Sequence, residues 1–143
     1  MKVERLALRN LVLIRLNPQD DLLLGLRKAV AGNGIKNAVI LSGVGSVISH
    51  HYHVVSSRVN PPLQSFIAGE APADIVNING YVINGRVHAH VIYSNNDIAY
   101  GGHLEEGSLI LTFSAIAMAE VDADFDKWDT IGNIEDLLNS SIS

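Results

Sequence analysis

The fold of this chain is decided by residues 84–104, which read NGRVHAHVIYSNNDIAYGGHL. Asn84-Gly85 is a strong signal for a two-residue β-hairpin turn, because both residues tolerate positive φ. Residues 86–93 then alternate as a strand, and Asn95-Asn96 is expected to form the next turn before a strand over residues 98–104. The stretch therefore predicts consecutive antiparallel strands.

Three histidines of this stretch are expected to converge on one face of the sheet. If the loop consists of residues 95–96, His88 lies opposite His103, and directly opposed residues share a face. His90 joins them because strand residues two apart point the same way. Three neutral imidazoles with an open fourth position form the ligand set of a catalytic zinc site, whereas structural zinc sites usually have four protein ligands.

The convergence depends on the turn. A three-residue loop would place His103 on the opposite face, and a bulge at Gly101-Gly102 would shift the register by one. His88 and His90 would then be solvent-facing strand residues, and His103 would lie in a glycine loop without function. The spacing alone leaves both interpretations open.

A second histidine group and a pair of acids accompany the first three. On a strand His51 and His53 share one face while His50 lies on the other. They are either surface or interface histidines or a His-x-His pair lining the same cavity, although no third ligand lies nearby in sequence. Glu105 lies two residues beyond His103 and is a candidate fourth ligand, orienting partner of a histidine or general acid/base. Glu106 is a candidate for the same roles. Both also fit an exposed Glu-Glu-Gly turn.

Composition limits the class of protein. We expect 143 residues to form one domain, and 48% hydrophobic residues with a mean hydropathy of +0.22 indicate a well-packed globule with a subunit interface. The chain has no cysteine, which excludes disulfides and thiolate zinc ligands. The early apolar stretch is interrupted by Arg5, Arg9 and Arg15, so it fits neither a signal peptide nor a membrane span, and the expected location is the cytoplasm.

Charge argues against nucleic acid as a partner. The net charge is −5, the sequence pI is about 5.6, and the ten basic residues are scattered without a run. Nucleic-acid binders normally carry a basic footprint, because phosphate neutralisation supplies most of their affinity. A local patch of Arg5, Arg9, Arg27 and Lys28 is the remaining alternative.

The remaining elements complete an α+β class with a mostly antiparallel sheet and one main helix. The helix is expected over residues 22–30, capped by Asp20 or Asp21 and stopped by Gly32-Asn33-Gly34. Gly43-Val44-Gly45 is expected to be a tight turn, and residues 57–72 a functional loop. Further strands are expected over residues 6–16, 38–41, 47–56, 74–83 and 109–121, with a short closing helix over 134–138 in the tail that begins at 122.

The sequence lacks the motifs of several kinds of binding site and active site. Gly43-Val44-Gly45-Ser46 has neither the Lys nor the spacing of a phosphate-binding loop, and no Gly-x-Ser-x-Gly elbow is present. Asp122, Asp124 and Asp126 lack the glycine and distal glutamate of a calcium loop, so they indicate a solvated acidic surface.

A series of motifs from about residue 11 to residue 120 resembles the PPC domain (plants and prokaryotes conserved), in its prokaryotic stand-alone form. Ile14-Arg15-Leu16 followed by Asp20-Asp21 and a helix is similar to the start of that family. The other motifs are Leu41-Ser42-Gly43-Val44-Gly45-Ser46-Val47, Asn79-Gly80, Gly85-Arg86-Val87-His88-Ala89-His90-Val91 and Gly101-Gly102-His103-Leu104-Glu105-Glu106-Gly107.

The resemblance implies an antiparallel α+β fold assembled as a homotrimer. Some prokaryotic members of that family bind zinc through the histidines matching His88, His90 and His103. It also implies a relationship to acetolactate decarboxylase, a zinc enzyme with histidine ligands. Land-plant members carry a basic AT-hook arm for DNA, and this sequence contains none. It departs from the family's Gly-x-Phe-Glu-Ile-Leu segment, which is here Ala73-Asp74-Ile75-Val76, so the partner role of that segment in plants is not carried over.

Two hypotheses follow. The first is a trimeric metalloprotein in which three histidines hold zinc, or nickel, cobalt or manganese, with a small-molecule ligand and with Glu105 or Glu106 assisting any chemistry. The second is a DNA-associated or regulatory module without enzymatic activity.

Overall fold

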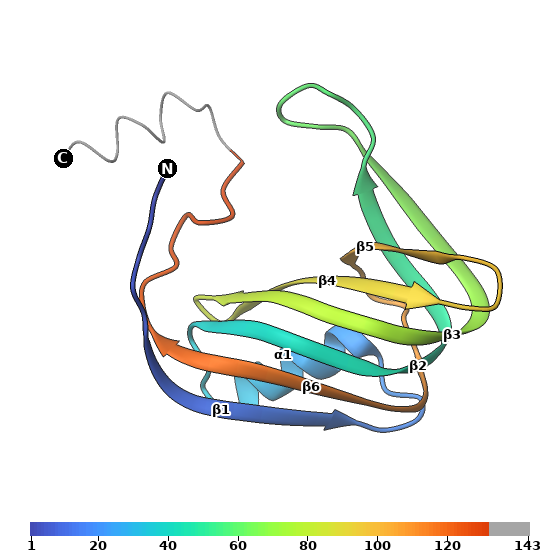
Figure 1. Ribbon diagram of the computed structural model, residues 1–143, viewed down its shortest axis with the longest axis horizontal. Helices are drawn as coiled ribbons and strands as arrows, with labels where there is room; N and C mark the ends of the chain where they lie inside the picture. Colours follow the sequence, from blue (N-terminus) through green and yellow to red (C-terminus); the bar gives the residue numbers. More distant parts are fainter. Residues whose placement is uncertain (132–143) are drawn as a thin grey trace.

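The computed structural model describes residues 1–131, and Figure 1 shows a strongly curved sheet with one helix packed behind it. The strands are β1 (Ala7–Leu16), β2 (Ala38–Val55), β3 (Gln64–Ile83), β4 (Arg86–Ser94), β5 (Ala99–Leu104) and β6 (Ile110–Asp122), and the helix is α1 (Leu22–Gly32). The order of the six strands among these residues is β1-β6-β2-β3-β4-β5, and β2 also pairs with β5.

Every strand pairing is antiparallel, so the expectation of a mostly antiparallel sheet with one main helix is confirmed over residues 1–131, with the sheet dominating. The helix expected over residues 134–138 lies outside the described residues. No helix of residues 1–131 has both the length and the apolar character that a membrane span requires.

Helix α1 begins at the second of its two candidate caps. The Asp21 carboxylate accepts a hydrogen bond from the backbone N of Leu24 at 3.0 Å, which satisfies one of the free N–H groups of the first turn. The same side chain accepts from the backbone N of Gly107 at 2.6 Å and so ties the loop after β5 to the helix. The helix ends at Gly32, as the Gly-Asn-Gly stop predicts.

The two faces of the sheet differ in what covers them. A cross-strand row of Val12, Met118, Ile40, Gly80 and Ala89 lies on the side of the main core, which includes the buried helix residues Leu22, Leu23, Leu26 and Val30. The neighbouring row of Leu11, Ala119, Val39, Tyr81 and His88 points the other way, because strand side chains alternate. We call this second side the open face.

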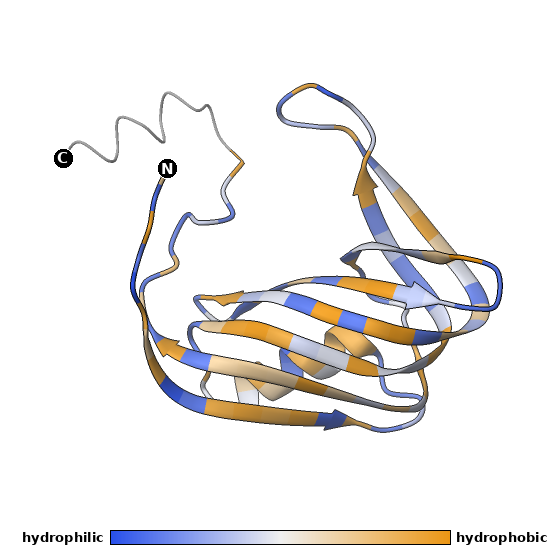
Figure 2. Ribbon diagram, in the orientation of Figure 1, coloured by the Kyte–Doolittle hydropathy of each residue, from blue (hydrophilic) through white to orange (hydrophobic). Residues whose placement is uncertain are grey.

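Strand β1 is apolar over much of its length, as the hydropathy colours of Figure 2 show, and alternate side chains of this strand lie on the open face. Leu11 and Leu13 are 62% and 77% exposed, and Val44 of β2 is 51% exposed on the same side. Contiguous exposed apolar residues of this kind usually mark a surface that another molecule covers.

The tight turn expected at Gly43-Val44-Gly45 is wrong, because these residues continue β2. The glycines serve close approach instead: a Cβ at Gly45 would lie 2.2 Å from the backbone O of Phe113 on β6. Glycine inside a strand often marks a place where another backbone comes this near.

The loop expected over residues 57–72 is also wrong for most of its length, because β3 begins at Gln64. Val55 pairs with Gln64, so the connection spans only residues 56–63 at the tip of a long β2–β3 hairpin, which projects from the sheet in Figure 1. Pro72 does not end the strand because it lies at the register shift opposite Ile48, where the ladder is already interrupted.

The turn between β4 and β5 has four residues, not two. Ser94 pairs with Ala99, and the Asn95 side chain accepts hydrogen bonds from the backbone N of Asp97 at 2.9 Å and of Ile98 at 3.0 Å, which stabilises the longer turn. The partner of His103 is therefore His90, and the predicted pairing with His88 is wrong. A shift of two residues nevertheless keeps every side chain on its predicted face.

Candidate metal centre

Three imidazoles meet on the open face, on the adjacent strands β4 and β5. The candidate ligand atoms of His88, His90 and His103 all lie within 4.8 Å of one another. Their ring centroids are 4.7 Å apart for His88 and His103, 5.2 Å for His90 and His103, and 5.5 Å for His88 and His90. Nitrogens bound to a tetrahedral zinc ion at about 2.0–2.1 Å lie about 3.4 Å from one another, so small side-chain rotations suffice for one shared ion.

A carboxylate that the sequence did not predict orients the first of these rings. The Nδ1 atom of His88 lies 3.1 Å from Oδ2 of Asp129, which leaves Nε2 as the atom free to bind an ion. Arg86 holds the carboxylate by two hydrogen bonds, from Nη1 to Oδ2 at 2.6 Å and from Nη2 to Oδ1 at 3.0 Å. Arg86, the first residue of β4, thus binds an anion that the chain itself supplies.

The electrostatics of the cluster favour an anionic Asp129 and neutral imidazoles at His90 and His103. Hydrogen bonding from Arg86 lowers the pKa of Asp129 to about 2. Burial, together with the neighbouring imidazoles, lowers the pKa of His103 to about 4, and burial also lowers the pKa of His90. Neutral imidazoles keep the lone pair that a metal requires, so the donor set fits a divalent transition metal.

A second carboxylate–imidazole pair borders the other side of His103. Strand β5 pairs with β2 as well as β4, which places His53 directly opposite His103, with stacked rings 4.4 Å apart. The Nδ1 atom of His53 lies 2.6 Å from Oε1 of Glu105. The ligand atoms of His53, His103 and Glu105 form a second group within 4.8 Å. His53 thus meets one residue of β5 and the residue that follows this strand, and its expected partner His51 is not in the group.

The remaining candidates lie away from this cluster. The Glu106 side chain forms an ion pair with Arg27 of α1, and its backbone carbonyl accepts a hydrogen bond from Nδ1 of His51 at 2.6 Å. His50 lies on the other face of β2, as predicted, with Nδ1 3.3 Å from the hydroxyl of Tyr100. The structure therefore brings Glu105 to the histidines and directs Glu106 elsewhere.

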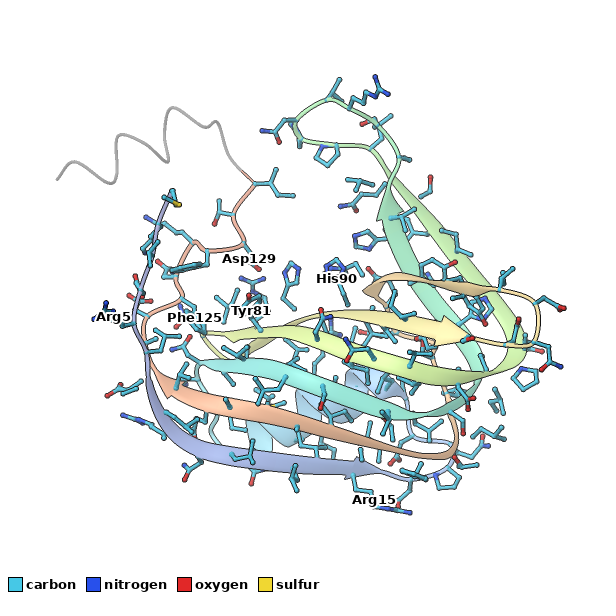
Figure 3. All side chains as sticks on the ribbon, in the orientation of Figure 1. Arg5, Arg15, Tyr81, His90, Phe125 and Asp129 are labelled. Atoms are coloured by element: carbon cyan, nitrogen blue, oxygen red, sulfur yellow. The ribbon has the colours of Figure 1, made fainter. Side chains whose placement is uncertain are left out.

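A cavity of about 620 Å³ adjoins His88 on the open face. Figure 3 shows Asp129 and Phe125 of the C-terminal segment beside Tyr81 of β3, on the side of the sheet that also carries His90. The lining is mostly apolar, and consists of Glu4, Leu6, Val39, Tyr81, Ile83, His88, Phe125, Trp128 and Asp129. Its volume is in the range of small-molecule sites.

The sequence contains a weak indication that the C-terminal segment lines this cavity. Phe125 and Trp128 are large apolar residues within the acidic tail, and Phe125 is only 4% exposed in the structure. Their presence indicates that the tail packs back on the sheet, which is how Asp129 reaches His88.

Comparison with known proteins gives a family and several related folds. The family described as the Plants and Prokaryotes Conserved (PCC) domain, abbreviated PPC above, matches residues 6–122. A PPC protein from Pyrococcus horikoshii is 22% identical, with 87% of each chain covered and a TM-score of 0.74. A metal-containing protein from Archaeoglobus fulgidus is 21% identical, with 93% of this chain and 98% of that chain covered and a TM-score of 0.77.

A candidate DNA-binding protein from Bacteroides thetaiotaomicron is 15% identical, with 83% of this chain and 85% of that chain covered and a TM-score of 0.67. At these identities the likeness is one of fold. The search of curated proteins found no significant match.

Proposed function

This chain belongs to the Plants and Prokaryotes Conserved domain family, and from that premise we propose that it is a metal-binding protein whose ion is held by His88, His90 and His103. The observation that carries the proposal is the approach of three imidazole ligand atoms to within 4.8 Å, with Asp129 orienting one of them. Oriented, neutral histidines are what a metal site needs and what a row of surface histidines lacks.

Zinc is the ion that we propose first. Three imidazoles with an open position suit zinc, and nickel, cobalt or manganese are the alternatives that such a donor set accepts. The metal-containing relative from Archaeoglobus fulgidus supports a metal in this fold without naming the element.

The surroundings of the ion suit a small-molecule ligand. A divalent ion at this position would supply Lewis-acid chemistry to a group bound at its open side. His88 and Asp129 also line the cavity, so a molecule bound there would lie beside that position. On the other side of the ring of His103, the carboxylate of Glu105 is hydrogen-bonded to His53, a pair suited to hold or move a proton. We keep Glu105 as the candidate acid/base and set Glu106 aside.

Metal analysis of untagged protein tests the proposal. We expect one divalent ion per chain, lost in His88→Ala and His103→Ala and kept in the control His50→Ala, whose imidazole lies on the other face. Absence of stoichiometric metal after purification and reconstitution, or full metal content in both cluster variants, would show that the histidines do not form the site.

We also propose that the protein assembles as a homotrimer through the apolar part of its open face. The exposed residues Leu11, Leu13 and Val44 support burial against another copy. Sedimentation equilibrium measures the mass directly: three times the chain mass of 15.4 kDa is expected, and a monomer would exclude the assembly.

DNA binding is the second candidate function. It is supported by the names of structural neighbours from Bacteroides thetaiotaomicron and Ralstonia eutropha, and opposed by the net charge of −5. Titration of duplex DNA at several salt concentrations is the test. Salt-dependent binding near physiological ionic strength supports this function, and no binding at micromolar protein removes it.

A further inference from the structure

Three aromatic rings and two carboxylates gather around the cavity beside His88. The ring centroids of Tyr81 and Phe125 are 6.0 Å apart at an interplanar angle of 85°, and those of Phe125 and Trp128 are 6.0 Å apart at 64°. The carboxylates of Glu4 and Asp129 lie in the same lining. Steeply inclined aromatic rings with nearby anions are the surroundings in which proteins hold organic cations.

An ammonium group of the chain itself already lies at the edge of this arrangement. The Nζ atom of Lys2 is 5.0 Å from the centroid of the Trp128 ring and 3.1 Å from Oε1 of Glu4. Glu4 and Trp128 both line the cavity, whereas the Lys2 side chain is 60% exposed. An aromatic face and a carboxylate thus receive a cation whose side chain remains largely exposed.

We propose that this cavity binds a small organic ammonium ion, with its alkyl groups against Tyr81, Phe125 and Trp128 and its charge between Trp128 and Glu4. The ammonium group of Lys2 occupies part of this position in the free protein and is displaced by the ligand.

The charges of the described lining favour a cation over an anion. Glu4 and Asp129 are its only acidic or basic residues apart from His88, and their partners Lys2 and Arg86 have side chains that are 60% and 62% exposed. The Glu4 side chain is 33% exposed and that of Asp129 is 14% exposed, so both carboxylates lie nearer the interior of the cavity than the cations that pair with them. An anion would meet two carboxylates, and a neutral molecule would leave the aromatic faces without their electrostatic partner.

Binding at this position does not require the proposed metal. The three rings and Glu4 belong to β3 and to the two terminal segments, whereas the histidines belong to β4 and β5. A titration of chelator-treated protein therefore separates the two proposals: the ammonium ion binds to the metal-free protein if this inference is right, whatever the metal analysis finds.

Trp128 provides the readout, since it is the only tryptophan of the chain. Choline is titrated while tryptophan fluorescence is followed, with 3,3-dimethylbutan-1-ol as the uncharged isostere and saturation-transfer NMR as a second signal. A cation–π contribution predicts saturable choline binding that is roughly twofold to thirtyfold tighter than binding of the alcohol. No binding by either method up to millimolar choline, or equal binding of the two molecules, would overturn the proposal.

Two variants should change the affinity in opposite directions. Lys2→Gln removes the competing ammonium group and is expected to tighten choline binding severalfold, whereas Glu4→Gln removes the counter-charge and is expected to weaken it severalfold. Lys28→Gln on α1 is the matched control for the loss of one positive charge and should leave the affinity unchanged. Opposite signs cannot arise from a general loss of stability, so weaker binding in Lys2→Gln would contradict the inference.

Discussion

Replacing Asp129 by alanine is expected to weaken zinc binding by about 10- to 100-fold, although Asp129 is not itself a proposed ligand. Its carboxylate accepts from Nδ1 of His88 at 3.1 Å and is fixed by two hydrogen bonds from Arg86. Without this carboxylate the ring of His88 is free to rotate and to exchange its proton between the two nitrogens.

The expected loss corresponds to about 1.4–2.8 kcal/mol of binding free energy, at about 1.4 kcal/mol for each tenfold change. This loss of binding free energy is smaller than the loss expected on removing the His88 imidazole, because in Asp129→Ala the ring of His88 is still present and its nitrogen can still bind the ion. The side chain of Asp129 is only 14% exposed, so water replaces the missing acceptor poorly.

Competition with a chromophoric chelator measures the zinc affinity of the wild type and the variants. Asp126→Ala is the matched control, because Asp126 is an exposed acid of the same segment and its carboxylate makes no contact with the described histidines. A double-mutant cycle sharpens the test: in His88→Ala, the additional change Asp129→Ala should cost almost nothing. Equal losses in Asp126→Ala and Asp129→Ala, or additive losses in the cycle, would refute the orienting role.

Three further changes test the fold and the assembly. Gly80→Ala should destabilise the protein by about 1–3 kcal/mol in urea denaturation, because φ is +143° and the new Cβ would lie 2.1 Å from the backbone O of His88, whereas Gly32→Ala, with nothing within 4 Å, should change stability little. The pKa of His103 is lowered from 6.5 to about 4 in the fold, so the unfolded chain takes up the proton first. The stability of metal-free protein should therefore fall as pH decreases from 6.5 toward 4, and His103→Gln should lose that part of the dependence in denaturation series at several pH values. Leu13→Glu, at a side chain 77% exposed in the single chain, should abolish the proposed trimer in sedimentation without unfolding the monomer, and an unchanged mass would exclude this face as the interface.

The histidine face was predictable although its register was not. The Asn95 side chain closes a four-residue turn by local hydrogen bonds, and sequence offered a two-residue turn at the same place. The two registers differ by an even number of residues, so both bring His88, His90 and His103 to one side of the sheet. The face on which a strand side chain lies can thus be predicted more reliably than its cross-strand partner.

The long strands were harder to predict because their interruptions have tertiary causes. Gly45 suggests a turn until the backbone of Phe113 is seen against it, and Pro72 suggests a loop until the bulge opposite Ile48 is known. Both depend on partners that are distant in the chain, which local patterns do not contain.

The two carboxylates illustrate the same limit at the site. Glu105 was a candidate because it lies two residues from His103, but its partner His53 comes from β2, 52 positions earlier. Asp129 is 41 positions from His88, in an acidic segment whose preceding carboxylates Asp122, Asp124 and Asp126 are exposed in the structure. Sequence spacing found the residues that share a hairpin, offered His53 of β2 only as an alternative, and missed Asp129.

The position of the three proposed ligands on the β4–β5 hairpin suggests that the metal centre forms in two stages. All three proposed ligands lie within residues 86–104, on strands joined by one short turn, so they come together through contacts that are local in the chain. Local hairpins form within about 1–10 μs, long before contacts of high sequence separation are complete. An ion captured at that stage would hold the hairpin in register while the remaining strands assemble, and only the docking of β2 and the C-terminal segment would then fix the ring orientations. In this order of events the metal would act first as a template for folding and only later as a finished site.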